Sequence, residues 1–327
     1  MLTVFVSRFT IFNMSNLYFY VSDSLNSYLN ISKECFFVEQ PLNGVVLYLW
    51  SNERTVVIGK HQNAARECDV RSLLADGGTL ARRYSGGGAV FHDAHNLNFT
   101  FVAQSEFYDQ NKHFDVIVNA LKAYGLNAVV SGRNDMEIDG KKFSGNAFYS
   151  KNGVKLHHGT ILIDTDKMLM QKYLTVSKEK LVAHGVESVK ARVVNLKELK
   201  PDIKKEDLIV KLRESFEKTY NTNAVDIKEK DFDANYIENK RKFLASDEWL
   251  YGFETYENSV EQKFSWGKVE VNYKVEKDVL TGVNIFTDAL DVDIIEEIKK
   301  YLIGKKLSGL SLIGEAVTDD VIGLLLK

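Results

Sequence analysis

Three consecutive glycines, Gly86 to Gly88, lie within the stretch RRYSGGGAVFHD at residues 82–93. Glycine loses more conformational entropy on folding than any other residue, so a glycine triplet is unfavourable inside a helix or a strand. The flanking stretches, TLARRY and AVFHDAHNLNFTFVAQ, have strand character, with apolar residues alternating against polar ones in the second. We therefore expect the glycines to form a loop between two strands. Either another group approaches this backbone closely, or φ is positive there.

The loop matches neither of two common nucleotide-binding patterns. A P-loop opens a helix and ends in lysine, but here no lysine follows the glycines and the next segment is strand-like. The dinucleotide pattern G-x-G-x-x-G also fails, because Phe91 stands where its third glycine belongs. The remaining possibilities are an anion site made of backbone N–H groups, with Arg82 or Arg83 adding charge, and a plain glycine-rich turn beside solvated arginines.

Composition narrows the class of protein. The chain has 327 residues, 45% of them apolar, and this length suggests one large domain plus a smaller one. Its net charge is −3 and the charges are dispersed, so we expect no nucleic-acid partner. Cys35 and Cys68 are too few for a disulfide framework, which fits the reducing cytoplasm. No apolar run reaches the roughly 18 residues that span a bilayer, so we expect no membrane partner.

Strand-like and helix-like patterns both occur along the first 245 residues. Two apolar runs, 45–50 and 55–60, are separated by polar SNER and predict a β-hairpin. Apolar residues recur at helical spacing over 114–124. An Asp-Gly pair and an Asn-Gly pair, both strong hairpin signals, predict a β-meander over 134–164.

The pattern changes towards the C-terminus. A mostly helical stretch, 166–245, is followed by strand-like residues 261–287 and by two helical patterns over 291–327. No linker rich in proline, glycine or serine marks the boundary. We therefore divide the chain into an extension of unknown role at 1–13, a large domain at 14–245 and a small domain at 250–327.

Two further segments carry a specific resemblance. They are SGRNDMEIDGKKFSGNAF at 131–148 and KLHHGTILID at 155–164. Together with the glycine loop, in this order and spacing, they resemble the bacterial lipoate-protein ligases, and the similarity extends from about residue 16 to 290. The resemblance implies an α+β fold, made of a large domain of the biotin/lipoyl-ligase type, with a mixed β-sheet and flanking helices, and a small α/β C-terminal domain.

The same resemblance implies a two-step activity that uses ATP and Mg²⁺. Lipoate and ATP would give lipoyl-adenylate and pyrophosphate, and the lipoyl group would then pass to one lysine of an acceptor domain. The implied acceptors are the lipoyl domains of 2-oxoacid dehydrogenase E2 subunits and the glycine cleavage H protein. Burying the four-methylene chain of lipoate would contribute about 3 kcal/mol, at ~0.8 per methylene.

By position, the resemblance also implies the site residues. Lys142 matches the lysine that touches both the lipoyl carbonyl and the nucleotide phosphate. The residues that match ATP contacts are Arg83, Gly88, Ala89, Val90 and Phe91, and those expected to bind lipoate are Gly86, Gly87, Gly88 and Lys142. Asn134 and Asp135 could hold phosphate or magnesium, although a turn aspartate often caps its own backbone instead. In the family the stretch matching 175–192 folds over the adenylate, with Gly185 as a candidate hinge.

The histidine pair gives a separate expectation. His157 and His158 are adjacent on a predicted strand, so their side chains point to opposite faces and at most one can line a cleft. A metal pair is therefore not expected, and we expect both histidines to be satisfied within the core.

Two other functions compete with the ligase. An octanoyl or lipoyl transferase of the same superfamily would carry the acyl group on a cysteine thioester. Cys35 and Cys68 lie beside neither the glycine loop nor Lys142 in the sequence, which favours the ligase. The third possibility is a non-catalytic lipoate-binding protein, against which the presence of Lys142 argues.

Overall fold

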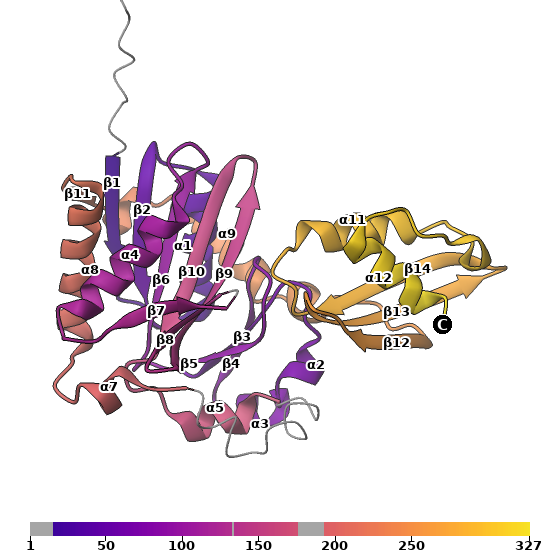
Figure 1. Cartoon of the computed structure of the whole chain (residues 1–327), viewed down its shortest axis with the longest axis horizontal. Coiled ribbons are helices and arrows are strands. Elements are labelled where there is room, and N and C mark those ends of the chain that lie inside the picture. The colour runs from indigo at the N-terminus through magenta and orange to yellow at the C-terminus, as the bar shows by residue number, and fades with distance from the viewer. Residues whose placement is uncertain (1–15, 133, 176–192) are drawn as a thin grey trace, which may run out of the picture.

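The computed structural model describes residues 16–132, 134–175 and 193–327. Within these residues a large lobe is built around a broad sheet, and a smaller lobe extends from its side (Figure 1). The predicted α+β class is confirmed. The expected extension at 1–13 lies outside the described residues. In the described part of the chain, every helix is too short or too polar to cross a membrane.

The central sheet of the large lobe has eight strands, in the order β11-β1-β2-β6-β10-β9-β8-β7. It is mixed, because β1 pairs in parallel with both β2 and β11, whereas the other neighbours are antiparallel. The strands are β1 (Asn16–Val21), β2 (Gly44–Trp50), β6 (Leu97–Gln104), β7 (Ala128–Ser131), β8 (Asp135–Ile138), β9 (Lys141–Lys151), β10 (Val154–Ile161) and β11 (Ala224–Asp226).

Helices cover both faces of this sheet. Those on one face are α4 (Gln110–Lys122) and α8 (Lys205–Tyr220), and those on the other are α1 (Ser27–Glu39) and α9 (Ala234–Leu244). Strand β2 is buried along its whole length because alternate residues contact different faces. Leu47 packs into the core beneath α4 and α8, while its neighbour Tyr48 packs into the core beneath α1 and α9. In the sequence, such a strand is a continuous run of apolar residues rather than an alternation of apolar and polar ones.

A second sheet carries the glycine loop. It has three strands in the order β4-β3-β5, namely β3 (Thr55–Ile58), β4 (Thr79–Arg82) and β5 (Val90–His92), with β3 parallel to β4 and antiparallel to β5. The predicted hairpin between 45–50 and 55–60 is wrong, because β2 and β3 belong to different sheets. Both runs are buried, and a short polar connection between them fits a crossing between two sheets as well as a hairpin.

The predicted β-meander is confirmed, with β8, β9 and β10 pairing in sequence. Its two turns contain Asp139 and Gly140 at φ of 51° and 72°, and Asn152 and Gly153 at 51° and 78°. Positive φ at both central residues is the type I′ arrangement, which matches the right-handed twist of the paired strands. These two turns fix the register that places Lys142 near the start of β9.

The small lobe packs two helices on a three-stranded antiparallel sheet around its own apolar core. Its elements are β12 (Asn258–Lys263), β13 (Lys268–Glu276), β14 (Val279–Thr287), α11 (Asp293–Leu302) and α12 (Ala316–Leu325), with a 3₁₀ turn at Leu307–Gly309. The remaining elements of the large lobe are α2 (Ala64–Glu67), α3 (Val70–Ala75), α5 (Lys167–Tyr173), α7 (Leu196–Leu199), a 3₁₀ turn at Glu229–Asp231 and α10 (Asp247–Tyr251).

The end of β14 and the segment that follows it are hydrogen-bonded to the glycine loop and to His61 of the large lobe. The N–H of Gly87 donates to the carbonyl of Ala289 at 3.0 Å, and the N–H of Thr287 donates to the carbonyl of His61 at 2.9 Å. The His61 ring in turn donates from Nε2 to the carbonyl of Val292 at 3.1 Å. Residues of the small lobe therefore lie directly against the loop that the sequence singled out.

Candidate active site

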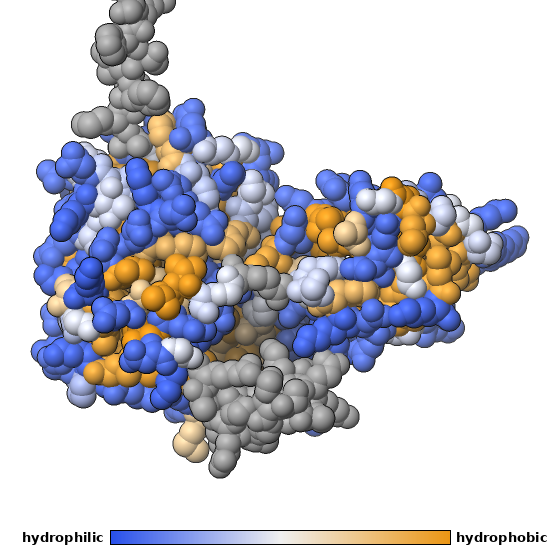
Figure 2. All heavy atoms as spheres, in the orientation of Figure 1, coloured by the Kyte–Doolittle hydropathy of each residue, from blue (hydrophilic) through white to orange (hydrophobic). Residues whose placement is uncertain are grey.

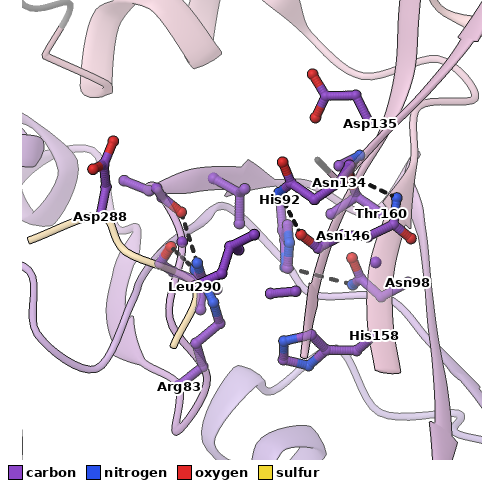
Figure 3. A pocket seen from close by; sticks show the side chains of 18 of the residues that line it. Arg83, His92, Asn98, Asn134, Asp135, Asn146, His158, Thr160, Asp288 and Leu290 are labelled. Carbon is purple, nitrogen blue, oxygen red and sulfur yellow. Dashed lines mark hydrogen bonds between the residues drawn. The ribbon is translucent and has the colours of Figure 1, made fainter. Parts of the chain in front are cut away.

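A cavity of about 300 Å³ lies where the meander, the glycine loop and the small lobe meet (Figure 3). Eight of the predicted site residues line it, namely Arg83, Gly87, Gly88, Ala89, Val90, Asn134, Asp135 and Lys142. Gly86 and Phe91 do not line it. Gly86 packs against backbone of the small lobe, and the side chain of Phe91 is buried against Tyr173 on the far side of the strand. Only the backbone of Phe91 is left for a ligand.

Lys142 enters the cavity while its neighbour Lys141 is exposed outside it, as the alternation along a strand predicts. Its Nζ lies 2.7 Å from Oδ1 of Asp135, and both side chains are about one-third exposed. Gly145 makes room for this ammonium group, because a Cβ at that position would lie 3.0 Å from Lys142 Nζ. The pair therefore sits at a partly solvated edge of the cavity.

Asn134 is held by reciprocal hydrogen bonds with Asn146 on β9. Its Nδ2 donates to the carbonyl of Asn146 at 2.6 Å, and the N–H of Asn146 donates back to its carbonyl at 2.8 Å. The turn before β8 is thereby fixed on β9, which keeps Asp135 beside Lys142. Among the described residues, no three His, Cys, Asp or Glu side chains are grouped closely enough to hold a metal ion without other ligands.

Arg83 holds the glycine loop in shape. Its guanidinium donates to the carbonyls of Val57, Gly86 and Gly88 at 3.0, 2.7 and 2.8 Å, and its Nε donates to Ser85 Oγ at 3.0 Å. Burial lowers the pKa of Arg83 to about 10, so it stays charged at neutral pH. None of these partners is a carboxylate, and the buried positive charge therefore favours an anion in the cavity.

Buried polar side chains, connected to one another by hydrogen bonds, lie next to the glycine loop. Nδ1 of His158 donates to the Glu34 carboxylate at 2.7 Å, and its Nε2 lies 2.7 Å from the Ser85 hydroxyl oxygen. Thr100 donates to the same carboxylate at 2.7 Å. His158 therefore lines the cavity, whereas His157 faces the large core, where burial lowers its pKa well below the usual value. The expectation that at most one of the two lines the cleft is confirmed. The expectation that both are satisfied within the core is wrong, because His158 lines the cavity and Nδ1 of His157 has no hydrogen-bond partner among the described residues.

His92 presents a free donor to the cavity. Its Nδ1 accepts from the side-chain amides of Asn52 and Asn98 at 3.1 and 3.4 Å, so the ring proton is on Nε2. Burial lowers the pKa of His92 to about 3, which keeps the ring neutral. Nε2 is buried and has no hydrogen-bond partner in the described protein. A ligand atom that accepts a hydrogen bond would satisfy it.

The remaining wall of the cavity is apolar, and its main members are Ile31, Trp50, Val57, Val90, Ala147 and Leu290. The cavity thus offers cationic and hydrogen-bonding groups together with an apolar surface, which suits a molecule with an anionic head and an apolar tail. Sequence reasoning missed Glu34, Trp50, His92 and His158 as lining residues. They come from separate strands and a helix, and only the fold brings them together.

Neither cysteine reaches the cavity. Both thiols are buried. Cys35 lies in the core beneath α1, and Cys68 packs against the second sheet of the large lobe, β4-β3-β5. Burial raises the pKa of Cys35, and it raises that of Cys68 to about 12. A thiol in this state is protonated at neutral pH and is a poor nucleophile. The stretch expected to fold over an adenylate, including Gly185, lies outside the described residues except for its first residue, Thr175.

Comparisons with known proteins show the family of this chain. A family model described as the lipoyl protein ligase A/B catalytic domain matches residues 29–217, and one described as the bacterial lipoate protein ligase C-terminus matches residues 254–313. The chain is 38% identical over 306 residues to lipoate-protein ligase A of Bdellovibrio bacteriovorus, covering 90% of each protein.

Solved structures give the same result. The chain is similar to the P. falciparum protein LipL1 in complex with lipoate, with 30% identity, a TM-score of 0.82 and coverage of 95% of this chain and all of that one. It is also similar to a lipoate-protein ligase A bound with ATP, with 25% identity, a TM-score of 0.61 and coverage of 73% and 99%. The expected fold is confirmed, and the chain belongs to the lipoate-protein ligase family.

Proposed function

We propose that this protein is an ATP-dependent lipoate-protein ligase, which activates lipoate as lipoyl-adenylate and transfers the lipoyl group to a lysine of an acceptor protein. The observation that carries the proposal is the position of Lys142. Lys142 and the glycine loop line the same cavity, whose lining combines polar and apolar side chains. That arrangement suits a carboxylate and a phosphate meeting at one end of an apolar tail.

In the first step the lipoate carboxylate attacks the α-phosphorus of ATP and pyrophosphate leaves. Two anions approach each other, so Lys142 stabilises the charge on the reacting oxygens once it leaves Asp135. The N–H groups of Gly87 and Gly88 belong to a loop that Arg83 holds in place. Gly87 already donates to Ala289, which leaves the N–H groups of Gly88 and Ala89 as backbone donors for a ligand in the described part of the loop.

The residues beside Lys142 offer Mg²⁺ one carboxylate ligand, that of Asp135. The ion usually keeps several waters and binds through one or two carboxylates together with substrate phosphates. Asp135 supplies one such carboxylate beside Asn134, at the same edge of the cavity as Lys142. When bound there with ATP, Mg²⁺ would neutralise phosphate charge. The test is the dependence of pyrophosphate release on Mg²⁺ in the wild type and in Asp135→Asn.

In the second step the acceptor lysine attacks the lipoyl carbonyl and AMP leaves. We infer that the acceptors are lipoyl domains of 2-oxoacid dehydrogenase E2 subunits and the glycine cleavage H protein.

We further infer that residues 14–245 carry lipoate and ATP, that residues 250–327 are an accessory domain, and that the protein acts in the cytoplasm. Residues 1–13 have no assigned role.

One assay separates the three candidate functions. The ligase releases pyrophosphate with ATP and lipoate, and it modifies the acceptor only when ATP is present. A thioester-dependent transferase would modify the acceptor from an acylated donor protein without ATP. A non-catalytic binding protein would neither release pyrophosphate nor modify the acceptor, but it would bind lipoate.

The cysteines give a direct prediction against the transferase. The double variant Cys35→Ser and Cys68→Ser should keep most ATP-dependent ligation, because both thiols are buried away from the cavity. Acceptor lipoylation should be measured by intact mass, with folding checked by circular dichroism. A folded but inactive double variant, together with a thioester on the wild type, would contradict the ligase.

Chain length of the acyl substrate gives a second prediction. Octanoate should be a usable substrate, whereas butyrate should be a very poor one because it has four methylenes fewer to bury against the apolar wall. At ~0.8 kcal/mol per methylene the loss is about 3 kcal/mol, or roughly 10²-fold in kcat/KM. Pyrophosphate release measured over a series of acids tests this. Equal kcat/KM for butyrate and lipoate would mean that the tail binds elsewhere.

A further inference from the structure

His157 on β10 is a buried polar side chain that the proposed reaction does not use. It is fully buried beneath α4, whose solvent-facing residues are polar (Figure 2). Aromatic rings surround it, namely those of Phe99, Phe101, Phe114 and Phe148. Its Nδ1 has no hydrogen-bond partner among the described residues, which is unfavourable at a buried position. A phenylalanine would avoid this cost, so the hydrogen bond of the other ring nitrogen is the feature that distinguishes histidine here.

The pairing of β9 with β10 explains how His157 reaches Asn146. Gly159 lies directly opposite Asn146, and His157 is two residues away from Gly159 on the same face of β10. A diagonal neighbour of this kind is within reach of an aromatic side chain. Gly159 leaves the space for the contact, because a Cβ there would lie 2.7 Å from Asn146 Oδ1 and 2.6 Å from Phe99 Cζ.

The contacts of the Asn146 amide decide which atom donates. Its Nδ2 lies 3.1 Å from the carbonyl oxygen of Asn134, which can only accept, so the amide is oriented with Oδ1 towards His157. Oδ1 can only accept as well, and Nε2 of His157, 2.9 Å away, therefore carries the ring proton. Burial lowers the pKa of His157 well below its usual value, so the ring is neutral and keeps this one proton. His157 thus holds the Asn146 amide in a single orientation.

Asn146 in turn holds the turn that precedes β8. Three hydrogen bonds join it to Asn134, because in addition to Nδ2 its backbone N–H donates to the Asn134 carbonyl and its own carbonyl accepts from Asn134 Nδ2. Both asparagines line the cavity and lie next to each other near Asp135 (Figure 3). Asp135 follows Asn134 directly and contacts Lys142 at 2.7 Å. The orientation of one buried amide therefore bears on the position of the Asp135 carboxylate.

We propose that His157 is a positioning residue for adenylation, which orients Asn146 and thereby holds the turn of Asn134 and Asp135 beside Lys142. This inference rests on the proposed ligase function. His157 does not line the cavity, so it acts on the substrates only through Asn146. The turn is placed to meet the phosphates of ATP and their magnesium ion. Lipoyl-adenylate has already lost pyrophosphate, so its transfer to an acceptor depends less on this turn.

Two substitutions remove the donor and one keeps it. His157→Phe fills the aromatic surroundings with another ring, and His157→Leu fills them with a smaller aliphatic side chain. In His157→Gln the amide nitrogen can take the place of Nε2 and donate to Asn146. Each protein is tested by urea unfolding, by pyrophosphate release at varied ATP and at varied lipoate, and by transfer from supplied lipoyl-adenylate to a lipoyl domain.

His113→Phe is the matched control. His113 on α4 is also fully buried, and its ring centroid lies 5.6 Å from that of His157. Neither of its ring nitrogens has a hydrogen-bond partner among the described residues. This substitution therefore replaces a buried histidine in the same core without removing a hydrogen bond.

For His157→Phe and His157→Leu we expect kcat/KM for ATP to fall about 10- to 100-fold, mainly through a higher KM, which is the usual scale for losing a group that orients a ligand-binding residue. The KM for lipoate and the transfer from lipoyl-adenylate should stay near wild type. His157→Gln should retain most of the wild-type kcat/KM for ATP. His113→Phe should match the wild type in every rate.

The alternative of a purely structural role gives different results. Folded His157→Phe and His157→Leu proteins with an unchanged kcat/KM for ATP would refute the proposal, as would a His157→Gln protein that is as slow as they are. Equal losses in His113→Phe, or losses that follow the unfolding midpoint rather than the presence of a donor, would also overturn it. A wild-type protein that releases no pyrophosphate from lipoate and ATP would refute the proposed function and this inference together.

Discussion

Replacing Lys142 by alanine should lower adenylation of lipoate by about 10²-fold or more, the loss seen when one preorganised stabiliser of transition-state charge is removed. Lys142 is the lysine that lines the cavity in the described part of the chain, and it is held by Asp135 at 2.7 Å. Transfer from supplied lipoyl-adenylate should suffer less, because the bond between carboxylate and phosphate is already formed. Pyrophosphate release and acceptor lipoylation should therefore be measured separately.

Lys141→Ala is the matched control for this variant. The two lysines are neighbours on β9, but Lys141 is exposed outside the cavity, and a solvated lysine contributes little. It should behave like the wild type in both assays. Equal losses in the two variants would mean that the charge near the strand matters, rather than the ammonium group inside the cavity.

The substitution Gly86→Ala should be the most damaging of the alanine substitutions in the glycine triplet. A Cβ at Gly86 would lie 2.1 Å from the carbonyl oxygen of Ala289 and 2.7 Å from that of Leu290. Both neighbours are backbone atoms, so the loop or the small lobe must shift. Overpacking of this kind costs about 1–3 kcal/mol of stability. A displacement of about 1 Å at the loop can lower adenylation by roughly 10²-fold.

Gly88→Ala provides the comparison for stability. A Cβ at Gly88 meets no atom within 4 Å, and its φ is not positive, so the variant should unfold at the wild-type denaturant concentration. Urea unfolding of both variants, read alongside pyrophosphate release, tests the pair. A stable and active Gly86→Ala protein would show that the contact between the loop and the small lobe has no bearing on the site.

Local features of the sequence predicted local structure well. The Asp-Gly and Asn-Gly turns predicted the meander because positive φ is required at those positions and few residues accept it. Alternation along a strand requires neighbouring residues to face opposite sides, and this holds for Lys141 and Lys142 on β9 and for His157 and His158 on β10. In each case neighbouring residues decide the outcome, so no knowledge of the tertiary fold is needed.

The failures involve contacts between distant parts of the chain. Two buried runs joined by polar residues look like a hairpin, yet β2 pairs with β1 and β6, whereas β3 pairs with β4 and β5. Glu34 and Trp50 reach the cavity from a helix and a strand of the large lobe, and Asp288 reaches it from the small lobe. No periodicity marks such residues, because only the pairing of the sheets and the docking of the small lobe bring them together.

The most direct test of the ligase is exchange of labelled pyrophosphate into ATP in the absence of any acceptor. This exchange requires reversible formation of an acyl-adenylate, so it isolates the step that Lys142 is proposed to assist. We predict exchange that depends on lipoate, is supported by octanoate and is lost in Lys142→Ala but not in Lys141→Ala. Absence of exchange in the folded wild-type protein, or exchange that is indifferent to lipoate, would contradict the assignment of this cavity as the site of lipoate activation.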